Sequence, residues 1–97
     1  MNKKAQIIGM LQTKFPQIQR QFSVSKIALF GSCARGHMRK SSDIDILVDF
    51  KVTPDIFKFL ALEEFLSKLL KRKVDLATRR ALKPLVRQNI LREAIEI

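Results

Sequence analysis

"ALFGSCARGHMRKSSDIDILVDF", residues 28–50, is the stretch that decides the fold. An apolar run ends in Gly31-Ser32, a basic loop follows, and acidic residues then alternate with aliphatic ones. Alternation with a period of two is typical of a β-strand with one buried face. We therefore predict one strand over 26–31, a loop, and a second strand over 44–50.

The segments around this stretch complete an expected order of helix, strand, strand, helix, strand, helix. Apolar residues recur at helical spacing in three of them, and a short alternating run marks the last strand. Thr53 and Pro54 are the expected helix cap and first-turn proline of the second helix, and Pro16 is expected to end or bend the first helix. The expected helices carry apolar faces within 7–15, 56–69 and 86–94, and the third strand covers 73–77.

The composition is that of an ordinary globular domain. The chain has 97 residues, of which 46% are hydrophobic and 29% are charged. This length is enough for one core and too short for a second domain. We therefore expect residues 1–97 to form a single α+β domain in which helices pack on one face of a small mixed β-sheet.

The charge and the cysteine content limit the partners and the compartment. A formal net charge of +10 favours acidic partners, but the basic residues are scattered and Trp and Tyr are absent, so nucleic acid is not expected as the main ligand. No apolar run approaches the ~20 residues that cross a bilayer, and the N-terminal apolar run is too short for a signal peptide. The single Cys33 excludes an internal disulfide, which favours the cytoplasm.

Acidic residues of the second expected strand share one face. Side chains alternate along a strand, so Asp43, Asp45 and Asp49 point one way and the aliphatic residues point the other. Asp43 and Asp45 then lie roughly 7 Å apart, which suits Mg²⁺, a cation usually held by one or two carboxylates together with phosphates. Asp49 lies roughly 13 Å beyond Asp45, and we expect it to be a strand-end acid or a salt-bridge partner.

Asp75 repeats this arrangement in the third expected strand, where it lies between Val74 and Leu76. If that strand pairs beside the second, Asp75 joins Asp43 and Asp45 on one face of the sheet. Carboxylates arranged in this way can hold two metal ions that bracket an in-line displacement at phosphorus. Asp75 is then the carboxylate expected to help remove a proton from the attacking hydroxyl.

Gly31 and Ser32 predict a phosphate site at the end of the first strand. A glycine there lets the backbone turn sharply and approach phosphate oxygens, and Ser32 adds a hydroxyl and an N–H at the start of a short helix. Arg35, with Gly36 beside it, is a candidate phosphate clamp.

The combined pattern resembles the polymerase-beta-like nucleotidyltransferase superfamily, whose signature is G-S, a loop, and D-x-D on a strand. Within that superfamily the stretch is similar to the minimal nucleotidyltransferase (MNT) proteins of bacteria and archaea. The resemblance extends over nearly the whole chain, including the later K-V-D-L and the terminal ILREAI. It implies the polymerase-beta-like nucleotidyltransferase fold.

The resemblance also implies a role for each residue of the signature. It implies that the carboxylates act as metal ligands and catalytic groups and that other residues of the signature hold the nucleotide. The implied metal ligands are Asp43, Asp45 and Asp75, and the implied nucleotide-binding residues are Gly31, Ser32, Arg35 and Gly36.

The activity that the resemblance implies is Mg²⁺-dependent transfer of AMP from ATP to a hydroxyl group, with release of pyrophosphate. MNT proteins are typically paired with a helical HEPN toxin, so the implied acceptor is a tyrosine of that partner and the implied role is that of its antitoxin. Three alternatives stay open: an antitoxin that neutralises its partner by binding alone, an aminoglycoside-type nucleotidyltransferase that needs a second subunit, and transfer to RNA. Arg79, Arg80 and Lys83 form either a partner-binding edge or a solvated one.

Overall fold

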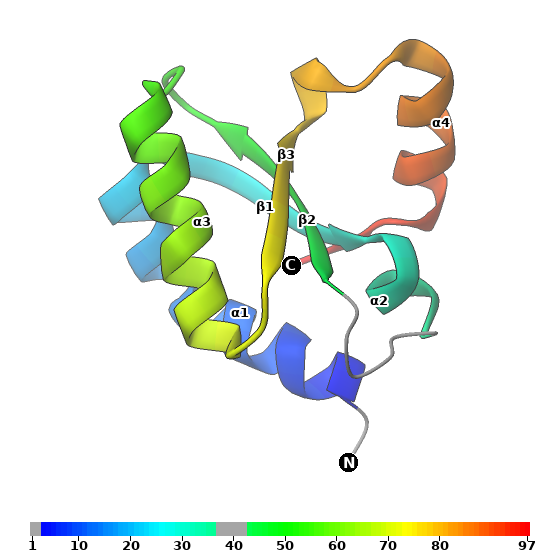
Figure 1. Cartoon of the computed structure of the whole chain (residues 1–97), viewed down its shortest axis with the longest axis horizontal. Helices are drawn as coiled ribbons and strands as arrows, with labels where there is room; N and C mark the ends of the chain where they lie inside the picture. Colours follow the sequence, from blue (N-terminus) through cyan, green and yellow to red (C-terminus); the bar gives the residue numbers. More distant parts are fainter. Residues whose placement is uncertain (1–2, 37–42) are drawn as a thin grey trace.

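The computed structural model describes residues 3–36 and 43–97, and within them every side chain except those of Ser32 and Arg35. It is an α+β structure built around a mixed sheet with the strand order β3-β2-β1-β4 (Figure 1). The α+β class expected from the sequence is therefore confirmed. The elements are α1 (Lys3–Phe22), β1 (Val24–Phe30), α2 (Gly31–Arg35), β2 (Ile44–Phe50), α3 (Ile56–Leu70), β3 (Val74–Thr78), the 3-10 helix η1 (Arg79–Ala81), α4 (Pro84–Glu93) and β4 (Ile95–Glu96).

The sheet combines antiparallel and parallel pairs. β1 is antiparallel to both β2 and β4, whereas β2 and β3 are parallel. Parallel neighbours need a crossover, because the chain must return to the same end of the sheet before it runs in the same direction again. α3 is that crossover, so its packing fixes how β2 and β3 meet.

The main core lies between the sheet and the pair of helices α1 and α3. The rings of Phe22 in α1 and Phe65 in α3 are 5.5 Å apart between centroids, which brings the two helices together over the strands. Apolar side chains of α1, α2, the strands and α3 form one buried cluster beneath them. Its members are Ile7, Leu11, Ile18, Phe22, Val24, Ile27, Leu29, Cys33, Ala34, Ile44, Ile46, Val48, Leu62, Leu66, Leu70, Val74 and Leu76.

The opposite face of the sheet carries a smaller buried area. Ala28 and Leu47, which are Cα partners across β1 and β2, are buried but lie outside the main cluster. α4 contacts α2 and β1, and in this fully described helix no residue is buried. The expectation that helices pack on one face is thus confirmed for α1 and α3, while α4 stands apart from them (Figure 1).

The structure excludes an end of the first helix at Pro16 and corrects the expected cap of α3. α1 continues through Pro16, although proline lacks the N–H that would bond to the carbonyl of Gln12. Both residues are exposed, so water can replace the missing donor. The cap of α3 is Asp55 and not Thr53, because the Asp55 carboxylate accepts a hydrogen bond of 2.8 Å from the N–H of Lys58.

The structure also corrects the boundaries of several strands and the last segment. β1 begins at Val24 and β3 extends to Thr78, each beyond the expected range. Val86 and Leu91 of α4, expected to face inward, are 46% and 39% exposed. β4 has no counterpart in the expected elements, because a strand this short shows no alternation in sequence. In the described part of the chain, no helix is both long and apolar enough to cross a membrane.

Candidate active site

Asp45 and Asp75 occupy matching positions on neighbouring strands. β2 and β3 are parallel, and the two aspartates are direct Cα partners in the register of that pair. On the other face, Ile46 is the partner of Leu76, and both are buried in the main core. The sequence expectation that Asp75 joins the acids of the second strand depended on this pairing, and the structure contains it.

Gly31 lies directly against the Asp45 carboxylate. Its predecessor Phe30 is the Cα partner of Asp45 across β1 and β2. A Cβ added at Gly31 would lie 3.0 Å from Cγ and 3.3 Å from Cβ of Asp45, closer than such atoms normally approach. Gly31 also has a φ of +69°, in the left-handed region. Sterics and backbone conformation therefore both require glycine at this turn.

Asp43 precedes β2 and, like Asp45, is partly exposed to solvent. Its Oδ2 lies 3.9 Å from Nζ of Lys73, with the two side chains 43% and 80% exposed. The N–H of Ile44 donates a hydrogen bond of 2.9 Å to the Lys73 carbonyl, which ties the start of β2 to the start of β3. An exposed pair at this distance is weak, so a stronger cationic ligand can displace Lys73 from the carboxylate.

The donor set fits Mg²⁺ only if phosphate completes the coordination. Among the residues that the structure describes, no three His, Cys, Asp or Glu side chains are grouped closely enough to hold a metal ion. Mg²⁺ is usually bound by one or two carboxylates together with substrate phosphates and water. The in-register pair Asp45 and Asp75 supplies carboxylates of this kind, beside a turn at Gly31 where a phosphate can approach.

The edge strand β3 is held by two side chains that the sequence analysis did not identify. The hydroxyl of Ser67 accepts a hydrogen bond of 3.1 Å from the N–H of Val74, and the Glu63 carboxylate accepts one of 3.5 Å from the N–H of Leu76. These amides flank Asp75 and point away from β2. The sequence signal for Glu63 and Ser67 is that two polar residues stand four positions apart on α3, next to the row of apolar residues that faces the core.

Cys33 anchors α2 in the core beside the acids. Its side chain is fully buried. Burial raises the pKa of the Cys33 thiol, Lys4 and Arg72 act in the opposite direction, and the nearby Asp45 carboxylate raises it further. The thiol is therefore protonated at neutral pH and acts as an apolar side chain.

Asp49 is separated from the other acids by its own ion pair. Its Oδ2 lies 3.3 Å from Nε of Arg79, whose NH2 group lies 3.9 Å from the Glu96 carboxylate. The contact lacks the alignment of a hydrogen bond, so it is an electrostatic pair. The expectation of a salt-bridge partner at Asp49 is confirmed. Arg79 is thus part of the fold, whereas Arg80 and Lys83 are exposed.

The remaining residues of the sequence pattern are described only in part. Ser32 and Arg35 belong to α2, and their side chains lie outside the described part of the structure. Gly36 follows with a φ of +77°, and its N–H donates a hydrogen bond of 3.2 Å to the Cys33 carbonyl. The stretch 37–42 of the basic loop also lies outside the described residues.

The sequence profile of the family described as "Nucleotidyltransferase domain" matches residues 10–97. The chain belongs to the nucleotidyltransferase domain family. This nucleotidyltransferase is 38% identical over 92 residues to the protein adenylyltransferase MntA of Thermococcus cleftensis, a match that covers 95% of this chain and 93% of the relative. The resemblance to nucleotidyltransferases seen in the sequence is thus confirmed.

Solved structures of related proteins match the fold of this nucleotidyltransferase. A structure described as a minimal nucleotidyltransferase has a TM-score of 0.83 and 31% identity, covering 100% of this chain and 97% of the other. A toxin–antitoxin complex with AMP-PNP matches with a TM-score of 0.69 and 28% identity, covering 96% and 70%. A tri-AMPylated HEPN toxin of Shewanella oneidensis in complex with its MNT antitoxin matches with a TM-score of 0.60 and 26% identity, covering 97% and 67%.

Proposed function

We propose that this nucleotidyltransferase transfers AMP from ATP to a hydroxyl group of a partner HEPN-type toxin and thereby acts as its antitoxin. The hydroxyl group that we propose as the acceptor is that of a tyrosine. The observation that carries the proposal is the in-register pair Asp45 and Asp75, with Gly31 packed against Asp45. The relatives support it, because one is named a protein adenylyltransferase and another is an MNT antitoxin complexed with an AMPylated HEPN toxin.

The proposed metal ligands are Asp43, Asp45 and Asp75. These carboxylates would hold two Mg²⁺ ions in the full site. The ions would neutralise the charge that develops at phosphorus. Carboxylate oxygens are suitable ligands for this cation, and the triphosphate provides the remaining ones. Lys73, which lies 3.9 Å from Asp43 in this structure, is the contact that would be exchanged on binding.

The proposed nucleotide-binding residues follow β1. Gly31 lets the backbone approach the triphosphate, and the N–H groups at the start of α2, that of Ser32 among them, are donors for phosphate oxygens. Arg35 and Gly36 are proposed to hold the phosphates from the other end of α2. In this arrangement the nucleotide lies beside the face that carries Asp45.

The proposed reaction exchanges a phosphoanhydride bond of ATP for a phosphoester bond to the acceptor. The acceptor hydroxyl oxygen forms a bond to the α-phosphorus of ATP, and the bond from that phosphorus to the bridging oxygen of the β-phosphate breaks. Pyrophosphate leaves with the electron pair of the broken bond. Asp75, the most exposed of the three acids, takes the proton of the attacking hydroxyl.

The experiment incubates the chain with ATP labelled at the α-phosphate, Mg²⁺ and a purified HEPN protein from the same genome. We expect label on the HEPN protein, lost by at least about a hundredfold in Asp45→Asn and retained in Asp49→Asn, which lies on the same strand. Neutralisation of the toxin by Asp45→Asn without any label in the wild type would establish the antitoxin that acts by binding alone. Label on an aminoglycoside, and none on the HEPN protein, would establish a small-molecule nucleotidyltransferase. Label on RNA alone would establish RNA as the acceptor.

Two broader expectations are also proposals. We propose that residues 1–97 act as one nucleotidyltransferase domain, which the match over 10–97 supports. We propose the cytoplasm as the compartment, because the single cysteine is buried as a free thiol and such use of cysteine is typical of reducing compartments.

A further inference from the structure

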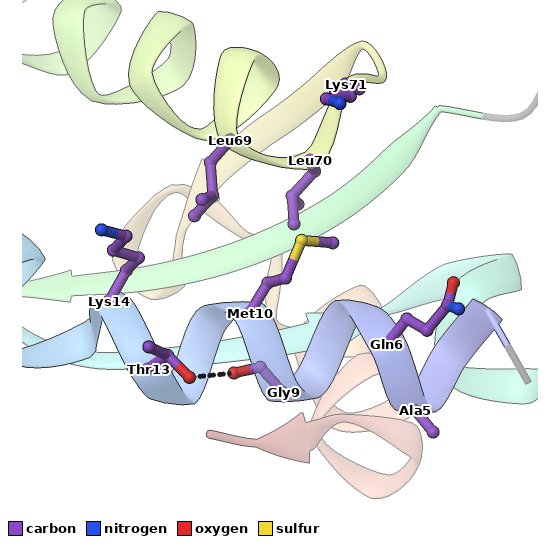
Figure 2. Close-up of a pocket in the computed structure, with 9 residues that line it drawn as sticks. All are labelled: Ala5, Gln6, Gly9, Met10, Thr13, Lys14, Leu69, Leu70 and Lys71. Carbon is purple, nitrogen blue, oxygen red and sulfur yellow. Dashed lines mark hydrogen bonds between the residues drawn. The ribbon is translucent and has the colours of Figure 1, made fainter. Parts of the chain in front are cut away.

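A cavity between α1 and the end of α3, which we call the α1–α3 groove, has no role in the proposed chemistry. Its volume is about 730 Å³, which is within the range of cavities that bind ligands. Met10 of α1 lies opposite Leu69 and Leu70 of α3 across it (Figure 2). Met10 is 36% exposed, so the groove presents apolar surface that the fold leaves uncovered.

The charge around the groove indicates the chemistry of its occupant. Lys14 and Lys71 lie toward its two ends (Figure 2), and none of the described residues that line it is acidic. A complementary surface therefore carries apolar side chains flanked by Asp or Glu. A second copy of the chain would bring the same lysines and a net charge of +10 against the groove, which disfavours self-association there.

The groove ends next to the candidate active site. Lys71 caps the C-terminal end of α3, and Lys73, which contacts Asp43, follows two residues later. Lys71 and Asp75 are at most about 14 Å apart along the chain, from the length of an extended residue. A molecule held in the groove is therefore anchored, at its Lys71 end, within about 14 Å of Asp75 along the chain.

We propose that the α1–α3 groove docks an acidic, amphipathic helix of the protein acceptor. The identity of that protein as the acceptor rests on the proposed function. A helix suits the site, because apolar side chains three and four residues apart can enter a groove along one helix face while acidic residues on the flanking turns meet the lysines. Docking at this place holds the acceptor protein near the acids and so favours transfer to its hydroxyl.

Gly9 allows the groove to be filled without disturbing the fold. It lines the groove inside α1, and a Cβ added there meets nothing within 4 Å. Its carbonyl accepts a hydrogen bond of 2.8 Å from the Thr13 hydroxyl, drawn as a dashed line in Figure 2, and a side chain at position 9 leaves this acceptor in place. Leucine and alanine both have a higher helix propensity than glycine.

The test measures binding of two labelled synthetic helical peptides to the full chain by fluorescence anisotropy. One peptide has Leu on one face and Glu on the other, and the second has Lys in place of every Glu. We expect saturable binding of the Glu peptide and binding of the Lys peptide weaker by at least about tenfold. Gly9→Leu should weaken binding of the Glu peptide by at least about tenfold, and Gly9→Ala should change it by less than about twofold. Thermal melts should show neither variant less stable than the wild type.

Three results would overturn the proposal. They are no saturable binding of the Glu peptide, equal binding of both peptides, or unchanged binding to Gly9→Leu. A dimer in sedimentation that Gly9→Leu dissociates would assign the groove to a second copy instead. Asp45→Asn should bind the Glu peptide as the wild type does, so a failure of AMP transfer and a failure of docking give separate results.

Discussion

Asp45 and Asp75 face each other in register across the parallel pair β2–β3, although the whole of α3 lies between them in the chain. Like charges at directly opposed positions of a sheet destabilise it. The register brings two carboxylates to such positions here. A bound cation would remove the repulsion, so stability and metal binding are coupled at this pair.

The first prediction concerns that coupling. Without divalent cations, Asp75→Asn should raise the free energy of unfolding by about 0.2–1 kcal/mol, because it removes one of two opposed charges. Addition of Mg²⁺ with a non-hydrolysable ATP analogue should stabilise the wild type and have a much smaller effect on the variant. Urea denaturation followed by circular dichroism measures both changes.

Asp49→Asn is the matched control for this prediction, because Asp49 lies on β2, the strand that pairs with β3, and has its own ion pair with Arg79. Loss of the ion pair between Asp49 and Arg79 should lower the free energy of unfolding by up to about 1 kcal/mol, the range for a partly exposed ion pair. The stabilisation by Mg²⁺ should remain as in the wild type. A destabilised Asp75→Asn that still responds fully to Mg²⁺ would contradict the coupling.

The second prediction concerns the turn at Gly31. Alanine there requires a left-handed backbone, at a cost of roughly 1–2 kcal/mol, and also displaces the Asp45 carboxylate. Gly36→Ala isolates the first effect, since Gly36 has a φ of +77° and an added Cβ meets nothing within 4 Å. Chemical denaturation should therefore show a larger loss of stability for Gly31→Ala than for Gly36→Ala. Equal losses would mean that Asp45 moves aside freely.

The third prediction concerns the outer edge of β3. Ser67→Ala leaves the N–H of Val74 without its protein acceptor and should lower the free energy of unfolding by about 1 kcal/mol. Glu64→Gln on the exposed face of α3, where Glu64 pairs with Lys68 at 3.0 Å, should change it by no more than about 0.5 kcal/mol. Hydrogen exchange should report faster exchange of the Val74 amide in Ser67→Ala. Unchanged exchange there would show that the hydroxyl does not hold the strand.

The fourth prediction concerns alkaline pH. Burial raises the pKa of Cys33 above its ordinary value of 9.0, so the folded state binds more protons than the unfolded state between the two values. This contribution to stability is complete below pH 9 and is lost as the pH rises through the folded pKa. Wild-type stability should therefore fall more steeply above pH 9 than that of Cys33→Ala, as thermal melts at successive pH values would show. Parallel curves would contradict the shift.

The sequence was sufficient for the parts of the fold that depend on local patterns. The alternation after Asp43 places Ile44, Ile46 and Val48 in the core, as the structure has them. The sequence predicts that Asp75 joins Asp45 only on the condition that their strands are neighbours, because no local pattern shows which strands pair. The crossover through α3 decides that pairing by tertiary packing.

Several features of the candidate site depend on contacts that no single-sequence pattern contains. The glycine at position 31 was expected for close approach to phosphate, but its contact with Asp45 follows from the pairing of β1 with β2. The bonds from Ser67 and Glu63 to β3 require the helix and strand to be placed first. Of the two outcomes expected at Pro16, an end or a bend, the end is excluded: α1 continues past the proline, because an exposed carbonyl can be hydrated.

The crossover through α3 has a consequence for the order in which the protein is made. β1, the Gly31 turn and β2 are synthesised before α3, so the antiparallel pair that sets Gly31 against Asp45 is available early. Asp75 reaches its position only after α3 has been synthesised and has brought the chain back along β2. Long-range closures of this kind are slow compared with local folding. A nascent chain therefore forms its glycine turn first and acquires its third carboxylate last.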